Sequence, residues 1–183
     1  MSKLPKVPDH LKKYQKLFDE HMKFVDKAAQ IVTSGHLIIE SALDNVLDLI
    51  FFHTEHVREA RLSFSQKMQL VRALALRKNK LQPWTLISSV NAVRNEISHN
   101  LAGEKRTKKM DQLRRIFVAG TNEKLQGRLE NADDEVIAYF ACLECVGFLG
   151  TLEQDTRALR DHMDRLDAVL NPTAERERPL SAQ

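Results

Sequence analysis

The chain is poor in the residues that make turns and strands. Its 183 residues include 6 glycines, 5 prolines and 6% aromatic side chains, whereas 43% of the residues are hydrophobic. A β-sandwich or barrel needs many tight turns and many β-favouring side chains, so this composition excludes an all-β fold. The hydrophobic share is large enough to build a core. We therefore expect an all-α fold.

Apolar residues recur at helical spacing in six segments of the chain. Residues 33–35 (Thr-Ser-Gly) are expected to interrupt the helix between the first two segments. Ser63 and Gln66 form a capping box at the start of the third segment, and Pro83 suits the first turn of the fourth. The expected helices cover residues 9–32, 36–59, 63–77, 83–101, 105–118 and 131–171.

These patterns divide the chain into an N-terminal helical extension (1–32), a bundle of five to six helices (33–170) and a disordered tail (171–183). Two cysteines give no disulfide framework, which favours a reducing compartment. The N-terminus lacks the apolar block of a secretion signal. The most apolar stretch, residues 36–52, contains three acids and is not expected to span a bilayer. We therefore expect a cytoplasmic protein with no membrane partner.

Positive charge is concentrated in the middle of the chain. Residues 65–118 contain twelve Lys or Arg against three acids, a net charge of +9, in a chain whose total is +3. Such an asymmetry favours a polyanionic partner. A set of solvated helix faces is the alternative.

The segment most informative about function is residues 93–101, near the end of the fourth expected helix. The apolar stripe of this helix centres near Val93, and Arg94 lies at the flank of the stripe. Asn95 and His99 share the nearly opposite face. His99 is therefore not expected to be a core histidine, and a solvated surface histidine is the alternative to a functional one.

The run Arg94-Asn95-Glu96-Ile97-Ser98-His99 resembles the R-x4–6-H motif of HEPN-domain proteins, including the polar residue that commonly follows the arginine. An apolar helix (36–52) and residues 62–74 precede the motif, so the resemblance covers about residues 30–165. It implies a helical bundle that forms a two-fold homodimer, with two motifs in one cleft. Many members of the family are metal-independent endoribonucleases that act as toxins or in phage defence.

The resemblance implies a reaction in which RNA supplies its own nucleophile, the 2′-hydroxyl. His99 can remove that proton or protonate the leaving 5′-oxygen, because an imidazole exchanges protons near neutral pH. Arg94 can stabilise the phosphorane, and Asn95 can orient a phosphate oxygen or the partner's His99. A two-fold dimer supplies one histidine as base and one as acid, with no metal or other cofactor.

Simpler roles exist for the same side chains. Arg94 can form a salt bridge at the flank of the helix, for example with the acidic stripe that includes Glu40, and Asn95 can lie on a helix surface or in a dimer interface. His36, Glu40 and Ser98 are further candidates to line the cleft.

A basic run follows the motif directly. Its cations are expected to hold an RNA backbone without reading the base sequence, and a solvated face is the alternative. One branch of the family has a tyrosine two residues after the histidine as the site of adenylylation. Leu101 stands there in this chain, which argues against control by that route. The cations are Lys105, Arg106, Lys108, Lys109, Arg114 and Arg115.

Two further patterns resemble metal sites. Cys142 and Cys145 form a C-x-x-C pair, but no second pair exists and they lie in an apolar helix, so we expect core packing. His53 and His56 lie three residues apart with no third ligand indicated, so we expect a surface cluster. No metal site is predicted.

Three functions remain open. The first is a HEPN ribonuclease, a toxin or antiviral effector whose partners are RNA, a second copy of the chain and an antitoxin or activator protein. The second is a non-catalytic regulatory or binding module, as in families that resemble the mannitol operon repressor. The third is a helical scaffold in which the motif is coincidental.

Overall fold

The structure, a computed structural model, describes residues 26–99 and 104–172, and for His99 only the course of the backbone. Over these ranges the chain is all-helical, with seven α-helices, one 3-10 helix and no strand. Most of the N-terminal extension, Leu101 and most of the tail lie outside the described residues. The helices are α2 (Lys27–Ile50), α3 (Thr54–Glu59), α4 (Phe64–Leu74), η2 (Leu76–Lys78), α5 (Pro83–His99), α6 (Glu104–Gly120), α7 (Glu123–Leu129) and α8 (Asp134–Leu170).

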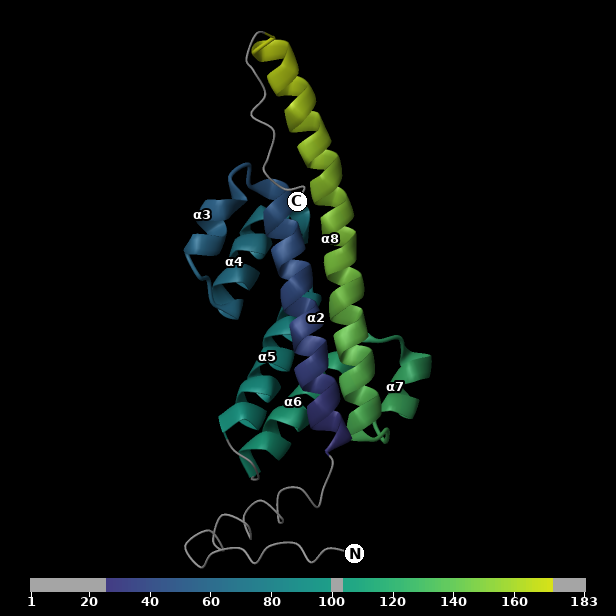
Figure 1. Ribbon diagram of the computed structural model, residues 1–183. Helices are drawn as coiled ribbons and strands as arrows, with labels where there is room; N and C mark the ends of the chain where they lie inside the picture. Colours follow the sequence, from purple (N-terminus) through teal and green to yellow (C-terminus); the bar gives the residue numbers. More distant parts are fainter. Residues whose placement is uncertain (1–25, 100–103, 173–183) are drawn as a thin grey trace, which may run out of the picture.

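Helices α2 and α8 run side by side in the same direction and form the long axis of the molecule (Figure 1). At the start of the pair, Lys27 lies 4.0 Å from Glu135. Near the end of α2, the Arg160 guanidinium donates to the carbonyl oxygen of Leu49 at 3.2 Å. Helices α4 and α5 pack against α2, and α5 and α6 pack against α8. The last turns of α8 extend beyond these helices (Figure 1).

The core forms where the apolar faces of α2, α4, α5, α6 and α8 meet. Trp84, the only tryptophan, lies in the first turn of α5 and is 1% exposed. Its indole N–H donates to the carbonyl oxygen of Lys78 at 2.8 Å, and its ring meets the edge of Phe148 with centroids 5.0 Å apart. These contacts place α5 against α8, as burial of a large aromatic side chain requires.

The interruption expected at residues 33–35 does not occur, so this prediction was wrong. Helix α2 continues through Gly35 because this residue lets α2 approach α8 closely: a Cβ atom there would lie 2.8 Å from Cβ of Cys142. The expected boundary between residues 32 and 33 therefore falls inside α2. The expected second helix (36–59) is also wrong in extent, because α2 ends at Ile50 and α3 follows separately.

Two predicted helix starts, at Ser63 and Pro83, are confirmed. The Ser63 hydroxyl accepts from the backbone N–H of Gln66 at 3.4 Å, and the Gln66 side-chain oxygen accepts from the N–H of Ser63 at 2.9 Å, which is the predicted capping box. Pro83 is the first residue of α5. Helix α7 was not predicted, although Asn122 caps its first turn. The final helix begins at Asp134 rather than near residue 131.

Helix α8 has 37 residues and is roughly 55 Å long at 1.5 Å per residue. Among the described helices it alone is long and apolar enough to cross a membrane by these two criteria, and 39% of its most apolar window is buried inside the bundle. A buried core helix meets the same criteria. Cys142 and Cys145 are part of that buried face, as predicted, and burial raises the pKa of the Cys142 thiol to about 11.

Candidate functional site

The R-x4-H motif occupies the last turns of α5. Arg94 as a whole residue is partly buried, and its guanidinium donates to the side-chain oxygen of Asn95 at 3.4 Å on the exposed side. The Ser98 hydroxyl donates to the carbonyl oxygen of Arg94 at 3.0 Å. His99 is the last residue of α5, and its side chain lies outside the described residues. The described part of the site is therefore an arginine and two polar side chains on consecutive turns of one helix.

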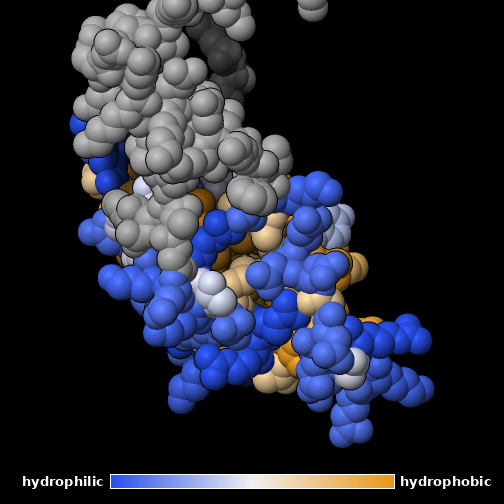
Figure 2. Space-filling model, turned by 90° about the horizontal axis from the view of Figure 1, so that it is seen from below, coloured by the Kyte–Doolittle hydropathy of each residue, from blue (hydrophilic) through white to orange (hydrophobic). Residues whose placement is uncertain are grey.

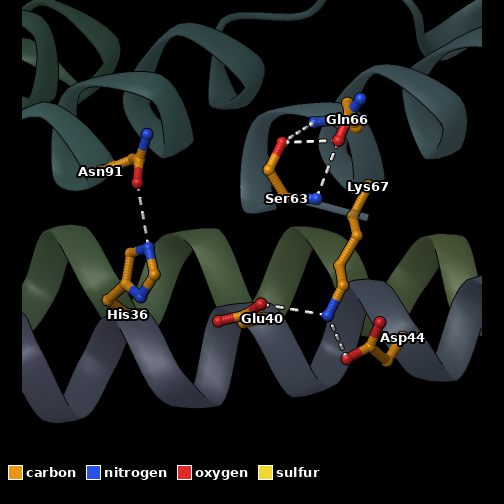
Figure 3. A network of polar contacts seen from close by, with 7 residues as sticks. All are labelled: His36, Glu40, Asp44, Ser63, Gln66, Lys67 and Asn91. Carbon is orange, nitrogen blue, oxygen red and sulfur yellow. Dashed lines mark hydrogen bonds and ion pairs between the residues drawn. The ribbon is translucent and has the colours of Figure 1, made fainter. Parts of the chain in front are cut away.

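His36 lies across from the motif, on α2. Its ring is 3% exposed, its Nε2 lies 3.0 Å from the side-chain oxygen of Asn91 on α5, and it stacks on Phe64 of α4 with centroids 4.2 Å apart (Figure 3). Its Nδ1 has no hydrogen-bond partner among the described residues. Buried at the junction of three helices, His36 packs against α4 and α5 and does not line an open cleft.

The surroundings of His36 disfavour its charged form. Burial lowers the pKa of His36; the hydrogen bond to Asn91 acts in the opposite direction, while the positive charge of Arg94 lowers the pKa further and the negative charge of Glu40 raises it. The net effect is a lowered pKa, and the imidazole is neutral at pH 7.

The acidic stripe of α2 binds a lysine rather than Arg94. The Lys67 ammonium on α4 lies 3.0 Å from the Glu40 carboxylate and 2.8 Å from that of Asp44 (Figure 3). Burial alone would lower the pKa of Lys67, but its hydrogen bonds to Asp44 and Glu40 outweigh burial and raise the pKa. Glu40 therefore fixes α4 against α2, and no ion pair between Glu40 and Arg94 occurs.

Two of the six cations predicted to hold RNA make contacts within the chain. Arg106 forms an ion pair with Asp26 just before α2. Arg114 donates to the carbonyl oxygens of Leu129 and Ala132, at 3.1 and 2.5 Å, and its other nitrogen lies 2.7 Å from Asp134. Arg114 thus joins the end of α7 to the start of α8.

Of the other four cations of α6, three are exposed and Lys109 is partly buried, and we call the four together the basic face of α6. Lys108 makes an exposed ion pair with Glu104 at 3.6 Å, which is worth little in water. This face begins immediately after the motif helix. Its members are Lys105, Lys108, Lys109 and Arg115.

Viewed along the long axis, from the end at which α2 and α8 begin, the coloured surface is mostly hydrophilic, with smaller hydrophobic areas between the polar side chains (Figure 2). Helix α5 ends and α6 begins at this end of the molecule (Figure 1). The motif helix therefore ends on the side of the molecule that Figure 2 shows.

His53 and His56 form an exposed pair on and just before α3, as predicted. Each ring lies near a neighbouring carboxylate, His53 at 3.4 Å from Glu55 and His56 at 3.6 Å from Glu59. Within the described ranges, no group of three or more metal-binding side chains comes together.

Two residues, Asn91 and Lys67, make contacts between helices that were not predicted from the sequence. Asn91 lies one turn before Arg94 on α5, and the sequence alone did not distinguish it from other polar residues of that helix. Lys67 follows the capping box directly, but its two carboxylate partners are on a helix that is distant in sequence. A helical wheel gives the face of a residue and cannot give the helix that this face meets.

No protein-family model, curated protein or solved structure matches this chain. The resemblance of residues 94–99 to the HEPN motif therefore stays a prediction from the sequence.

Proposed function

We propose that this protein is a metal-independent endoribonuclease of the HEPN type, acting in the cytoplasm as a toxin or antiviral effector under the control of an antitoxin or activator protein. The observation that supports this most directly is the placement of Arg94 and His99 on the last turns of one helix, with the basic face of α6 following at once. Arg94 has Asn95 as its neighbour and no described carboxylate of α2 as an ion-pair partner.

In the proposed reaction the RNA 2′-hydroxyl attacks the adjacent phosphorus and the 5′-oxygen leaves, which produces a 2′,3′-cyclic phosphate. His99 of one copy removes the hydroxyl proton, and His99 of the partner subunit protonates the leaving oxygen. Arg94 is permanently charged and stabilises the negative charge that develops on the phosphorane oxygens. Asn95 holds a phosphate oxygen, and the basic face of α6 binds the backbone on either side.

The test is cleavage of a mixed RNA substrate in the presence of EDTA. We expect the wild type to cleave and to leave 2′,3′-cyclic phosphate ends, and Arg94→Ala and His99→Ala each to lower the rate at least about 100-fold, as loss of an acid–base or charge-stabilising group does. Arg165→Ala and His162→Ala make the same chemical changes on an exposed part of α8 and should leave the rate unchanged. Equal cleavage by all five proteins would contradict the proposal.

A second candidate function is a non-catalytic module that binds RNA or protein. The observation that favours a module binding protein is the structural use of Arg106 and Arg114, which leaves fewer cations for a polyanion than the sequence predicted. A well-folded wild-type protein that binds RNA or another protein but cleaves no RNA would support this function over the first.

A further inference from the structure

Helix α8 exposes an apolar face along its first half. Four large side chains there point away from the core, and they recur every three to four residues, so they lie on one side of the helix. Together they leave on the order of 350 Å² of apolar surface uncovered, which is comparable with the largest apolar patch of a typical monomer. We call these residues the outer face of α8: Val136 (39% exposed), Tyr139 (55%), Phe140 (45%) and Leu143 (53%).

The neighbouring edge of α2 extends this face. Gly35 of α2 lies against Cys142 of α8, since a Cβ atom at Gly35 would be 2.8 Å from Cβ of the cysteine. Ile38 follows almost one turn later on α2 and is 56% exposed. The apolar surface therefore spans two helices that run side by side (Figure 1). A third helix laid along such a pair can bury its own apolar side against both of them.

The described chain begins at one end of this face. Asp26 is the N-cap of α2: its backbone is extended (φ −77°, ψ 94°), and its side chain accepts from the N–H of Ala29 at 2.9 Å. The next residue, Lys27, lies 4.0 Å from Glu135, which directly precedes Val136. Residues 1–25 lie outside the described residues, and they are joined to the fold beside the first residue of the outer face.

The sequence just before Asp26 has the pattern of an amphipathic helix. Its apolar residues recur every three to four positions, whereas every charged residue between 11 and 23 falls on the opposite half of a helical wheel. A helix over residues 11–22 extends roughly 16 Å, which is about the length of the apolar surface from Val136 to the level of Ile38. The apolar residues of this stripe are Leu11, Tyr14, Phe18 and Met22.

Charge favours contact between this segment and α8. Residues 1–25 contain six lysines and three acids, a net charge of +3. Residues 134–153 of α8, which include the outer face, contain four acids and no Lys or Arg. A basic segment is attracted to such a surface. An anionic lipid surface is repelled by it, so charge disfavours a membrane as the occupant. The four acids are Asp134, Glu135, Glu144 and Glu153.

We propose that residues 11–22 form a helix that docks on the outer face of α8 beside Ile38, antiparallel to α2 and α8. The connection of two to five residues that an antiparallel helix pair needs ends at Asp26. This tether holds the segment at an effective concentration in about the millimolar range, which a separate partner does not reach. His36 contacts Asn91 of α5 on another side of α2, so the docked segment leaves the motif helix uncovered. The proposal does not depend on RNA cleavage.

The accessibility of single cysteines tests whether the face is covered. Leu143→Cys and Leu166→Cys replace leucines of similar exposure, 53% and 59%, on the outer face and in the last turns of α8. In the full chain, a maleimide should label Leu143→Cys at least about tenfold more slowly, and the ratio should be the same at about 1 and 50 µM protein, because the contact is intramolecular. The unaltered chain measures the background from the buried Cys142 and Cys145. Equal labelling overturns the proposal, and so does protection that is lost on dilution, which would identify a second copy as the occupant.

Two adjacent substitutions test whether the stripe of the segment makes the contact. Phe18→Ser removes an apolar side chain at the centre of the stripe, and Leu17→Ser makes a similar change about 100° away around the helix. In the Leu143→Cys chain, Phe18→Ser should raise the labelling rate towards that of Leu166→Cys, whereas Leu17→Ser should change it less than about twofold. If Phe18→Ser had no larger effect than Leu17→Ser, the stripe would not be the docking side.

Pairs of cysteines test the direction of the docked helix. Met22→Cys should cross-link to Tyr139→Cys through a short bis-maleimide, with a product of the mass of one chain. Leu11→Cys should cross-link in the same way to Gly150→Cys, where an added Cβ atom meets nothing within 4 Å. The two exchanged pairs should react at least about tenfold more slowly, because positions 11 and 22 lie roughly 16 Å apart along a helix. Equal yields from all four pairs, or faster reaction of the exchanged pairs, would overturn the antiparallel docking.

Discussion

At the scale of single residues, His36 carries the least favourable environment in the described core. One ring nitrogen is hydrogen-bonded to Asn91, and the other is buried without a hydrogen-bond partner among the described residues. A neutral imidazole tolerates this arrangement because an unbonded ring nitrogen costs far less than a buried positive charge. The position of Arg94 nearby adds to the cost of protonating the ring.

A pH dependence of stability follows from His36. Its pKa is lowered in the folded chain, so between the unfolded value near 6.5 and the lower folded value the unfolded state binds more protons. The free energy of unfolding should therefore fall as the pH drops below about 6.5, by at most about 1.4 kcal/mol per pH unit from this group. Urea unfolding at pH 7.5 and 5.5 measures the effect.

The matched variant for this test is His36→Gln, which keeps an amide near Asn91 but cannot take up a proton. It should be less stable at pH 7.5, yet lose less stability than the wild type between pH 7.5 and pH 5.5. Parallel losses in the two proteins would show that groups other than His36 govern the acid response.

At the scale of helices, the features that depend on neighbouring residues could be predicted from the sequence, whereas the contacts between helices could not. Ser63, Gln66 and Pro83 act within one turn of their own helix, so their roles followed from the sequence. Residues 33–35 read as a break because serine and glycine disfavour helix interiors, but packing against α8 overrides that preference. The motif helix and its polar flank were predictable, whereas the Asn91–His36 contact depends on which helices meet.

The close approach of α2 and α8 gives a prediction for Gly35→Ala. The added methyl group would meet Cβ of Cys142, an atom that rotation of the cysteine side chain cannot move away. Overpacking of this kind costs about 1–3 kcal/mol and exceeds the gain of about 1 kcal/mol that alanine brings to a helix. Gly35→Ala should therefore lower the free energy of unfolding, as measured by urea denaturation.

Gly127→Ala is the control for this change, because a Cβ atom at Gly127 meets nothing within 4 Å. It should stabilise the protein by about 0.5–1 kcal/mol through helix propensity alone. If Gly35→Ala were equally stabilising, Gly35 would not be the residue that sets the distance between α2 and α8.

At the scale of the whole molecule, the cations in the middle of the sequence have two different uses. Some hold helices together, and others form the basic face of α6. The net charge of residues 65–118 suggested a polyanionic partner, and the run from Lys105 to Arg115 suggested a surface that holds an RNA backbone. In the structure, Lys67 binds the acidic stripe of α2, and Arg106 and Arg114 hold the ends of helices together. Charge counted along a sequence cannot separate these uses, because each depends on a carboxylate or carbonyl brought close by folding.

Arg114 and Arg115 are neighbours on α6, but replacing each with alanine should have different effects. Arg114→Ala removes the contacts to Leu129, Ala132 and Asp134 and should lower the free energy of unfolding by about 1–2 kcal/mol. Arg115→Ala should change stability by less than about 0.5 kcal/mol. It should weaken RNA binding and reduce the salt dependence by about one ion contact.

Chemical denaturation and RNA titrations at several salt concentrations measure the two quantities. If Arg115→Ala left both the affinity for RNA and its salt dependence unchanged, the basic face of α6 would be a solvated surface. A stable Arg114→Ala would mean that the junction of α7 and α8 is held by other contacts.

Because Trp84 is the only tryptophan of the chain and lies at the junction of α5 and α8, it makes the protein its own fluorescent reporter. Its emission should be blue-shifted while the indole is enclosed and should shift to the red when α5 separates from α8. The described motif residues Arg94 and Asn95 are on the same helix, about three turns away. A spectrometer can therefore follow the integrity of the motif helix in every variant above without an attached dye.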